Sequence, residues 1–300
     1  MEFVKYIPAK SIISGYKDDN QWFGINYNMN LYRGCCHGCI YCDSRSECYQ
    51  IEKFDLVRGK DNAIGLIKQE LQSKRKKGVV GTGAMSDPYN PFESKEQLTR
   101  KALEQVNHYK YGISIITKSP LITRDIDILK QIQHNAPTII KMTITTSDDK
   151  LCKKIEPNVA PSSERFEAIK ELSQNGIYTG VLLMPILPFI NDSEENIRTI
   201  IRKSAECGAK FVFAYGFGVT LRDIQRDYYF NQLKRIFPNT DLVQQYVKTY
   251  GNRYMNESIN SDYLWKVFKE ECKKYNLLYE MEAIIQDYKN PFYGTQLSLF

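Results

Sequence analysis

The sequence contains no long hydrophobic run. None of its apolar stretches reaches the roughly 18 residues that a membrane-spanning helix needs. The first ten residues, MEFVKYIPAK, have neither the apolar stretch nor the small-residue cleavage site of a secretory signal peptide. We therefore expect a cytoplasmic protein that does not associate with membranes.

The sequence also lacks low-complexity tracts, linkers and internal repeats with a period of roughly 20 to 50 residues. Its net charge of +6 is small for 300 residues, so it permits a polyanionic partner without requiring one. A hydrophobic content of 42% is enough for a substantial core. The economical division is one catalytic domain over residues 1–220 and a helical extension over residues 221–300.

Short β-branched apolar runs alternate with amphipathic stretches, as in parallel strands joined by crossover helices. Strands are expected at Asn26–Leu31, Val79–Thr82, Ile113–Thr117, Ile139–Thr145, Tyr178–Leu183 and Lys210–Tyr215. Helices are expected at Asn62–Ser73, Ser94–Gln105, Arg124–Gln133, Ser163–Ser173 and Ser193–Glu206. The pattern predicts an α/β fold, a partial (β/α)6 barrel of the TIM type with a helical C-terminal extension.

Five of the eight cysteines fall within a window of fourteen residues. Such clustering favours metal ligation over a disulfide scaffold. Cys35, Cys39 and Cys42 form a C-x3-C-x2-C motif that follows the first expected strand. Three thiolates satisfy three irons of a cubane and leave the fourth iron open. An open iron can chelate the amino and carboxylate groups of a methionine moiety.

A small zinc site is the alternative for this loop, with Cys36, Cys39, Cys42 and His37 as candidate ligands. No second ligand pair at zinc spacing accompanies them. Cys36 and Cys48 are therefore interpreted as bystanders. The remaining three cysteines lie in apolar or helical surroundings typical of core residues.

The cysteine loop resembles that of the radical S-adenosylmethionine (SAM) superfamily, including the aromatic Tyr41 before the last cysteine. The resemblance implies a [4Fe–4S] cluster that cleaves SAM reductively to a 5′-deoxyadenosyl radical. It also implies an electron donor such as flavodoxin or ferredoxin. Four further segments resemble the spore photoproduct lyase-like branch: Asn30 to Gly34, Gly81 to Glu93, Ile116 to Ser119 with Arg124 and Asp125, and Ile155 to Pro157 leading to Arg165.

Polar residues near the ends of the expected strands form a candidate cradle for the cofactor. Tyr41, Ser86, Asp87, Lys118, Thr145, Thr146 and Arg165 are the candidate cofactor-binding residues. The Ser-Asp pair can accept from the amino group of SAM, the lysine can meet its carboxylate or ribose, and the threonines its ribose. Arg165 can contact the carboxylate in a bidentate manner. The alternatives are a solvated loop lysine and a surface arginine in the first turn of a helix.

One position departs from the family pattern. Spore photoproduct lyase has a cysteine in a Cys-Thr-Ser-Asp segment that donates a hydrogen atom to the product radical. Here the segment reads Ala84-Met85-Ser86-Asp87, and a thioether carries no S–H bond. We therefore expect a lyase-like repair reaction on DNA that differs from repair of spore photoproduct itself. The alternatives are a radical enzyme acting on a protein or small molecule, and a non-catalytic iron–sulfur or zinc docking protein.

Two segments suggest partners. The run from Arg222 to Phe230 offers arginines for phosphates and tyrosines for base stacking, although it also fits the buried face of an amphipathic helix. The tail Gln296, Leu297, Ser298, Leu299, Phe300 resembles the pentapeptide by which bacterial polymerases and repair proteins bind the sliding clamp. The alternative is that the tail folds back onto the core.

Overall fold

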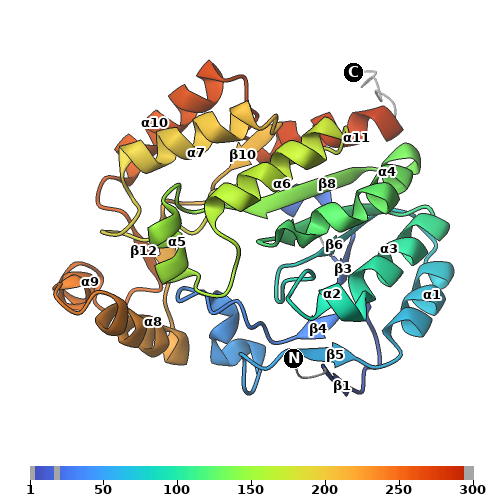
Figure 1. Cartoon of the computed structure of the whole chain (residues 1–300), viewed down its shortest axis with the longest axis horizontal. Helices are drawn as coiled ribbons and strands as arrows, with labels where there is room; N and C mark the ends of the chain where they lie inside the picture. Colours follow the sequence, from blue (N-terminus) through green and yellow to red (C-terminus); the bar gives the residue numbers. More distant parts are fainter. Residues whose placement is uncertain (1–3, 17–20, 294–300) are drawn as a thin grey trace, which may run out of the picture.

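The computed structural model describes residues 4–16 and 21–293, and its centre is a seven-stranded sheet (Figure 1). The strand order is β10-β9-β8-β7-β6-β3-β2. Six strands are parallel: β3 (Tyr27–Met29), β6 (Val79–Thr82), β7 (Gly112–Thr117), β8 (Thr138–Thr143), β9 (Thr179–Leu182) and β10 (Phe211–Phe213). Strand β2 (Ile13–Gly15) adds an antiparallel edge. The two edges do not pair among the described residues, so the sheet is open. The predicted α/β fold is confirmed.

Helices follow the parallel strands and cover one face of the sheet (Figure 1). They are α1 (Ala63–Ser73), α3 (Leu98–His108), α4 (Ile126–Asn135), α6 (Ser162–Gln174) and α7 (Glu194–Glu206). Ile113, Ile115, Ile140 and Met142 belong to the core cluster beneath these helices. Because side chains alternate along a strand, the neighbours of these residues face the concave side of the sheet.

The expected helix over Ser94–Gln105 is divided. The structure has α2 (Glu93–Glu96) and α3, separated by Gln97 at φ 48°. A left-handed residue breaks the continuous helix that the hydrophobic pattern favours.

Side chains fill the concave side of the sheet near the amino ends of the strands. Phe23 lies in the 3-10 helix η1 (Trp22–Gly24) and belongs to the same apolar cluster as Ile139. The hydroxyl of Tyr288, in α11 (Met281–Tyr293), donates a hydrogen bond of 2.6 Å to the carbonyl of Phe23. Lys141 of β8 is buried here and its amine donates to the hydroxyl of Ser114. Burial lowers the pKa of Lys141 to about 7. The hollow that the three clustered cysteines line lies at the opposite, carboxyl ends of the strands.

Several short elements lie outside the predicted pattern. A three-stranded sheet consists of β1 (Lys5–Ile7), β5 (Arg58–Lys60) and β4 (Tyr32–Arg33), and it flanks the cysteine loop. Helix α5 (Asp149–Ile155) follows β8. Strands of two or three residues with polar sequences such as RGK lack the apolar alternation by which strands are recognised.

The C-terminal region contains α8 (Asp223–Ile236), α9 (Leu242–Tyr250), α10 (Ser261–Lys274) and α11, with a small hairpin of β11 (Gly218–Thr220) and β12 (Met255–Glu257). Helix α10 lies beside α7 (Figure 1). The tail over residues 296–300 lies outside the described residues. None of the described helices has the length and apolar character required to cross a membrane.

Candidate cofactor site

Cys35, Cys39 and Cys42 line one hollow at the carboxyl ends of the parallel strands. The opposite wall comes from the loop Gly83–Asp87 after β6, from Lys118 after β7 and from Thr143 at the end of β8. The hollow opens to solvent. This edge of the sheet is where (β/α) barrels carry their chemistry, because the loops from several strands converge there.

The backbone of the cysteine loop is anchored on two sides. The amide of Cys35 donates 2.8 Å to the carbonyl of Phe54, and the hydroxyl of Ser86 donates 2.5 Å to the carbonyl of Gly34. Gly34 has φ 81°, and a Cβ there would lie 2.4 Å from the carbonyl oxygen of Leu56. Only glycine fits this turn.

The end of α5 and the loop between α5 and α6 form hydrogen bonds with the cysteine loop. The Ile40 amide donates 3.0 Å to the carbonyl of Ile155. The backbone amide of Asn158 donates a hydrogen bond of 3.1 Å to the carbonyl of His37. Its side-chain amide donates a hydrogen bond of 2.8 Å to the backbone carbonyl of Cys36. The segment that begins Ile155-Glu156-Pro157 therefore positions the cysteine loop. Sequence reasoning missed Asn158, which carries no motif signal.

The donor set fits an iron–sulfur cubane. Burial raises the pKa of the Cys35 thiol to about 12 and also raises the pKa values of Cys39 and Cys42, although Lys118 opposes the shift at the latter two. Thiolates therefore need a cationic partner, which iron supplies. Among the described residues, no three Cys, His, Asp or Glu side chains converge on a single ion. Cubane ligands each bind a different iron and surround a volume instead.

Asp87 lines the hollow, and its carboxylate is already held by the protein. It accepts from the amide of Tyr89 at 2.9 Å, the hydroxyl of Thr117 at 2.7 Å and the amide of Lys118 at 2.8 Å. Nδ1 of His37 lies 3.5 Å away, and burial lowers the pKa of that imidazole. Asp87 thus fixes the loop after β6 against the start of the loop after β7.

Lys118 places a positive charge in the hollow. Its ammonium lies 5.8 Å from the ring centroid of Tyr41. Burial lowers its pKa, but the nearby groups of Cys39 and Glu156 outweigh that effect, and the net pKa is raised. An ammonium in this position suits the carboxylate or the ribose of a bound cofactor, and the contact stays a prediction.

The structure does not bring Arg165 to the hollow. Its guanidinium is fully buried and pairs with Glu156 at 2.6 Å, and it donates to the carbonyls of Ala160 at 2.8 Å and Thr143 at 3.0 Å. The expectation of a contact with the cofactor carboxylate is therefore revised, because these partners occupy the guanidinium. Arg165 instead neutralises Glu156, which accepts a hydrogen bond from the hydroxyl of Tyr41.

Thr145 and Thr146 are buried but do not line the hollow. Oγ1 of Thr145 has no hydrogen-bond partner among the described residues, whereas Oγ1 of Thr146 accepts from the Asp148 amide at 3.2 Å. Thr143, which the sequence interpretation passed over, lines the hollow. Strand β8 ends at Thr143, two residues before its expected end at Thr145.

The radical SAM superfamily model matches residues 29–201. The chain belongs to the radical SAM superfamily. It is therefore an enzyme whose cofactors are a [4Fe–4S] cluster and SAM. The superfamily match includes all three cysteines and strands β6 to β9, and it ends within α7, before β10.

Proteins similar to this chain include an uncharacterized archaeal protein and a spore photoproduct lyase. An uncharacterized protein of Methanocaldococcus jannaschii is 34% identical over 174 residues, which are 57% of this chain and 64% of that protein. Spore photoproduct lyase of Clostridium acetobutylicum is 23% identical over 223 residues, 72% of this chain and 62% of that one. The chain spans less than two thirds of either relative.

Solved structures of spore photoproduct lyase share the fold. One mutant superposes with a TM-score of 0.70 at 14% identity, over 93% of this chain and 81% of its own. Another mutant, with bound AdoMet and dinucleoside spore photoproduct, has a TM-score of 0.65 at 16% identity, over 86% and 76% of the two chains.

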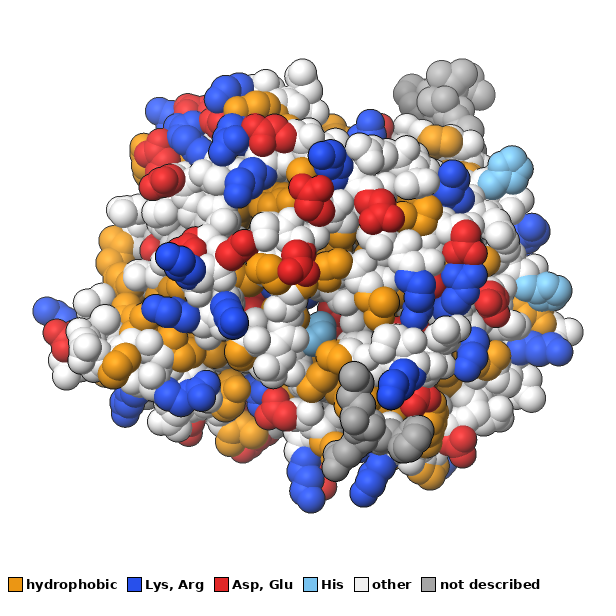
Figure 2. All heavy atoms as spheres, viewed as in Figure 1, with side chains coloured by type: hydrophobic (Ala, Val, Ile, Leu, Met, Phe, Trp, Pro, Cys, Tyr) orange, Lys and Arg blue, Asp and Glu red, His pale blue; other side chains and the backbone are white. Residues whose placement is uncertain are grey.

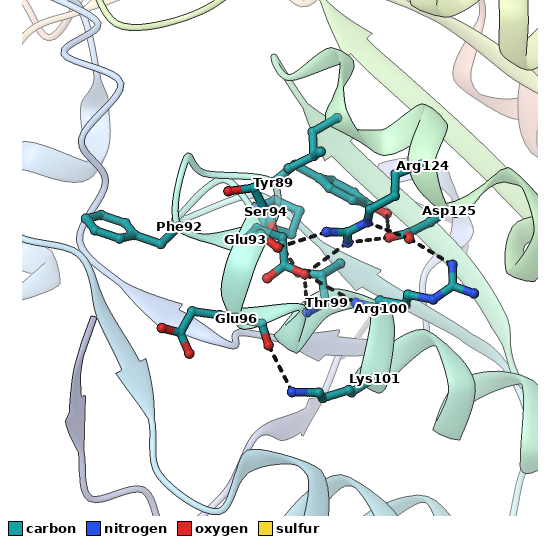
Figure 3. Close-up of polar contacts among 12 residues, drawn as sticks. Tyr89, Phe92, Glu93, Ser94, Glu96, Thr99, Arg100, Lys101, Arg124 and Asp125 are labelled. Carbon is teal, nitrogen blue, oxygen red and sulfur yellow. Dashed lines mark hydrogen bonds and ion pairs between the residues drawn. The ribbon is translucent and has the colours of Figure 1, made fainter. Parts of the chain in front are cut away.

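Glu93, Arg124 and Asp125, which lie in the segments that resemble the family, form a buried ionic cluster (Figure 3). Both carboxylates are fully buried. Arg124 bonds Asp125 at 2.8 Å and Glu93 at 3.2 Å, while Arg100 reaches Asp125 at 3.0 Å. The hydroxyl of Tyr89 donates 3.1 Å to Asp125. The cluster ties the loop after β6 to the 3-10 helix η4 (Pro120–Asp125), so these residues fix the wall of the hollow.

Helix α8 packs directly on the cysteine loop of the radical SAM site. Gln225 donates 3.3 Å to the carbonyl of Tyr41, and Arg222 pairs with Asp43 at 2.7 Å. Arg226 donates to the carbonyls of Leu221, Asn252 and Arg253, at 2.7 to 2.8 Å. Tyr229 is fully buried. The packing interpretation of the run from Arg222 to Phe230 is therefore favoured over phosphate binding.

Proposed function

We propose that this enzyme acts on DNA in a repair-type, lyase-like reaction, without the cysteine that returns a hydrogen atom in spore photoproduct lyase. The observation that carries the proposal is the side chain of Met85, which lines the hollow beside the three cysteines. It stands in the segment that resembles the hydrogen-donor segment of that lyase. A thioether cannot donate hydrogen from sulfur, so the fate of the product radical must differ.

The chain's own residues have separable roles in this proposal. When bound, the cluster and SAM supply a strongly reactive hydrogen-atom acceptor through reductive cleavage. Cys35, Cys39 and Cys42 would hold the irons, and the Lys118 ammonium would meet the carboxylate or the ribose of SAM. The carboxylate of Asp87 positions Lys118 by accepting a hydrogen bond of 2.8 Å from the backbone amide of Lys118.

The support for DNA comes from the relatives. The C. acetobutylicum relative is a spore photoproduct lyase, and solved lyases with bound dinucleoside spore photoproduct share this fold over 86% of the chain. The net charge of +6 is compatible with a polyanionic substrate.

An assay on dinucleotide spore photoproduct tests the role of Met85. The wild-type enzyme should cleave SAM but yield little repaired thymine, whereas Met85→Cys should increase the yield of repaired thymine per SAM cleaved. Met85→Ala is the matched control, since it removes the same side chain without adding a thiol. Efficient repair by the wild-type enzyme would contradict the proposal, because another donor would then have to stand in.

Binding to DNA at two salt concentrations tests the substrate class. Affinity that depends on phosphate contacts must fall steeply between about 50 and 200 mM salt. Absence of binding at low salt would redirect the search to protein or small-molecule substrates.

The proposal includes two protein partners in a cytoplasmic setting. The first is an electron donor such as flavodoxin or ferredoxin, because reductive cleavage consumes one electron. The second is the bacterial sliding clamp, to which residues 296–300 would bind. Tethering to a clamp raises the local concentration of DNA for an enzyme of modest positive charge.

A further inference from the structure

Basic side chains gather where α5 approaches the end of α8. Lys150, Lys153 and Lys154 of α5 and Lys234 and Arg235 of α8 are all exposed; together they define the α5/α8 surface. Figure 2 shows Lys and Arg side chains beside exposed hydrophobic surface over these helices. The ion pairs that lysines form among the described residues use Lys266 and Lys274, so the four lysines of this surface have no carboxylate partner there.

An aromatic contact joins the two helices at this surface. The ammonium of Lys154 lies 5.5 Å from the ring centroid of Phe237, the residue that follows α8. Phe237 is partly buried against the apolar cluster beneath, and Pro238 beside it is exposed. The surface therefore combines unpaired positive charge with accessible apolar area, as interaction sites often do.

The layer beneath this surface contacts the cysteine loop directly. Ile155 of α5 and Leu233 of α8 belong to the same apolar cluster as Cys39, Ile40 and Tyr41, and Phe237 packs against it. The Ile155 carbonyl accepts 3.0 Å from the Ile40 amide. One layer of packed side chains therefore separates the α5/α8 surface from a cluster ligand, on a side of the loop that does not open into the hollow.

We propose that the α5/α8 surface docks an acidic protein that donates single electrons at low potential. The inference rests on the radical SAM assignment and not on the choice of DNA as substrate. Reductive cleavage takes up one electron per event, while SAM and substrate fill the hollow, so the donor approaches elsewhere. The donor loses one electron and the cluster gains it, and no proton is transferred. A basic surface steers an acidic donor and speeds its docking.

Charge reversal separates this surface from general electrostatics. The test variant is Lys153→Glu, Lys154→Glu, Lys234→Glu. The matched control reverses three exposed cations on or after α1, at the other end of the strands, with Lys68→Glu, Arg75→Glu and Lys76→Glu. Both variants have the same net charge. Each reconstituted enzyme is assayed for 5′-deoxyadenosine without DNA, with either dithionite or reduced flavodoxin as reductant, and calorimetry measures flavodoxin binding directly.

The test variant should keep its iron content and its dithionite-driven rate, while its flavodoxin-driven rate and flavodoxin affinity fall about tenfold or more. The control variant should retain its iron content, both rates and its flavodoxin affinity. An unchanged flavodoxin affinity in the test variant would overturn the proposal, and so would an equal loss in the control. Loss of DNA affinity with an intact flavodoxin rate would assign the surface to nucleic acid instead, and would overturn it as well.

Discussion

The hydroxyl of Tyr41 donates a hydrogen bond to the carboxylate of Glu156, a residue 115 positions further along the chain. The same carboxylate pairs with Arg165 at 2.6 Å, and all three side chains are buried. The aromatic residue of the cluster motif is therefore held from behind by an ion pair. Glu156 and Arg165 act on the site by positioning, since neither lines the hollow.

Glu156→Gln should destabilise the iron-free protein by about 3 to 5 kcal/mol, because Arg165 then remains buried without a counter-charge. Tyr41→Phe removes only the hydrogen bond and should cost about 1 kcal/mol. Denaturant unfolding under anaerobic conditions measures both values. Equal stability of the two variants would show that the ion pair contributes nothing beyond the hydrogen bond.

The same ion pair has a pH signature. Burial raises the pKa of Glu156, but the charge of Arg165 outweighs it, and the net pKa is lowered. A carboxyl whose pKa is lower in the folded state stabilises the protein above its unfolded pKa of about 4.3, and this contribution is lost in acid. The stability difference between wild type and Glu156→Gln should therefore shrink as the pH falls below about 4.

The crossover pattern could be predicted from the sequence because its strands are buried runs of β-branched residues, and Val79–Thr82 matches β6 residue for residue. The convergence of Cys35, Cys39 and Cys42 on one hollow could be predicted because their spacing is local. The buried environment of Arg165 could not be predicted, because the sequence does not show that Glu156 is its ion-pair partner. The sequence extends this strand to Thr145 because the apolar run continues, whereas β8 ends at Thr143, and Thr143 lines the hollow.

The ligand assignment predicts a sharp division among the clustered cysteines. Cys35→Ala, Cys39→Ala and Cys42→Ala should each lose iron and SAM cleavage, because each thiolate binds one iron. Cys36→Ala and Cys48→Ala should keep both. Iron and sulfide analysis after reconstitution measures the outcome. If Cys36→Ala lost the cluster while Cys35→Ala kept it, the assignment would be displaced by one residue.

Lys141 should make stability depend on pH. Its pKa is lowered to about 7 by burial, against about 10.4 in the unfolded chain. Between these values the unfolded chain holds a proton that the folded chain does not, so stability rises with pH. Lys141→Met should therefore be more stable than wild type at about pH 6, on the order of 4 kcal/mol, and the gain should shrink by about pH 9. Urea unfolding at both pH values measures it, and a gain independent of pH would mean that the folded protein keeps the amine charged.

Deletion of residues 296–300 should abolish binding to the bacterial sliding clamp in a pull-down, because the Leu-Phe pair would supply the anchor for an apolar pocket. SAM cleavage and iron content should stay at wild-type levels. A truncated protein that precipitates or loses its cluster would instead assign the tail to the core, and the clamp proposal would fail.

The most direct test is the formation of 5′-deoxyadenosine. The protein is reconstituted anaerobically with iron and sulfide, reduced with dithionite and mixed with SAM, and the nucleoside product is quantified beside the Cys39→Ala variant. The wild-type enzyme should produce 5′-deoxyadenosine and the variant none. A wild-type sample with a fully loaded cluster that releases no 5′-deoxyadenosine would contradict the assignment of the hollow as a radical SAM site.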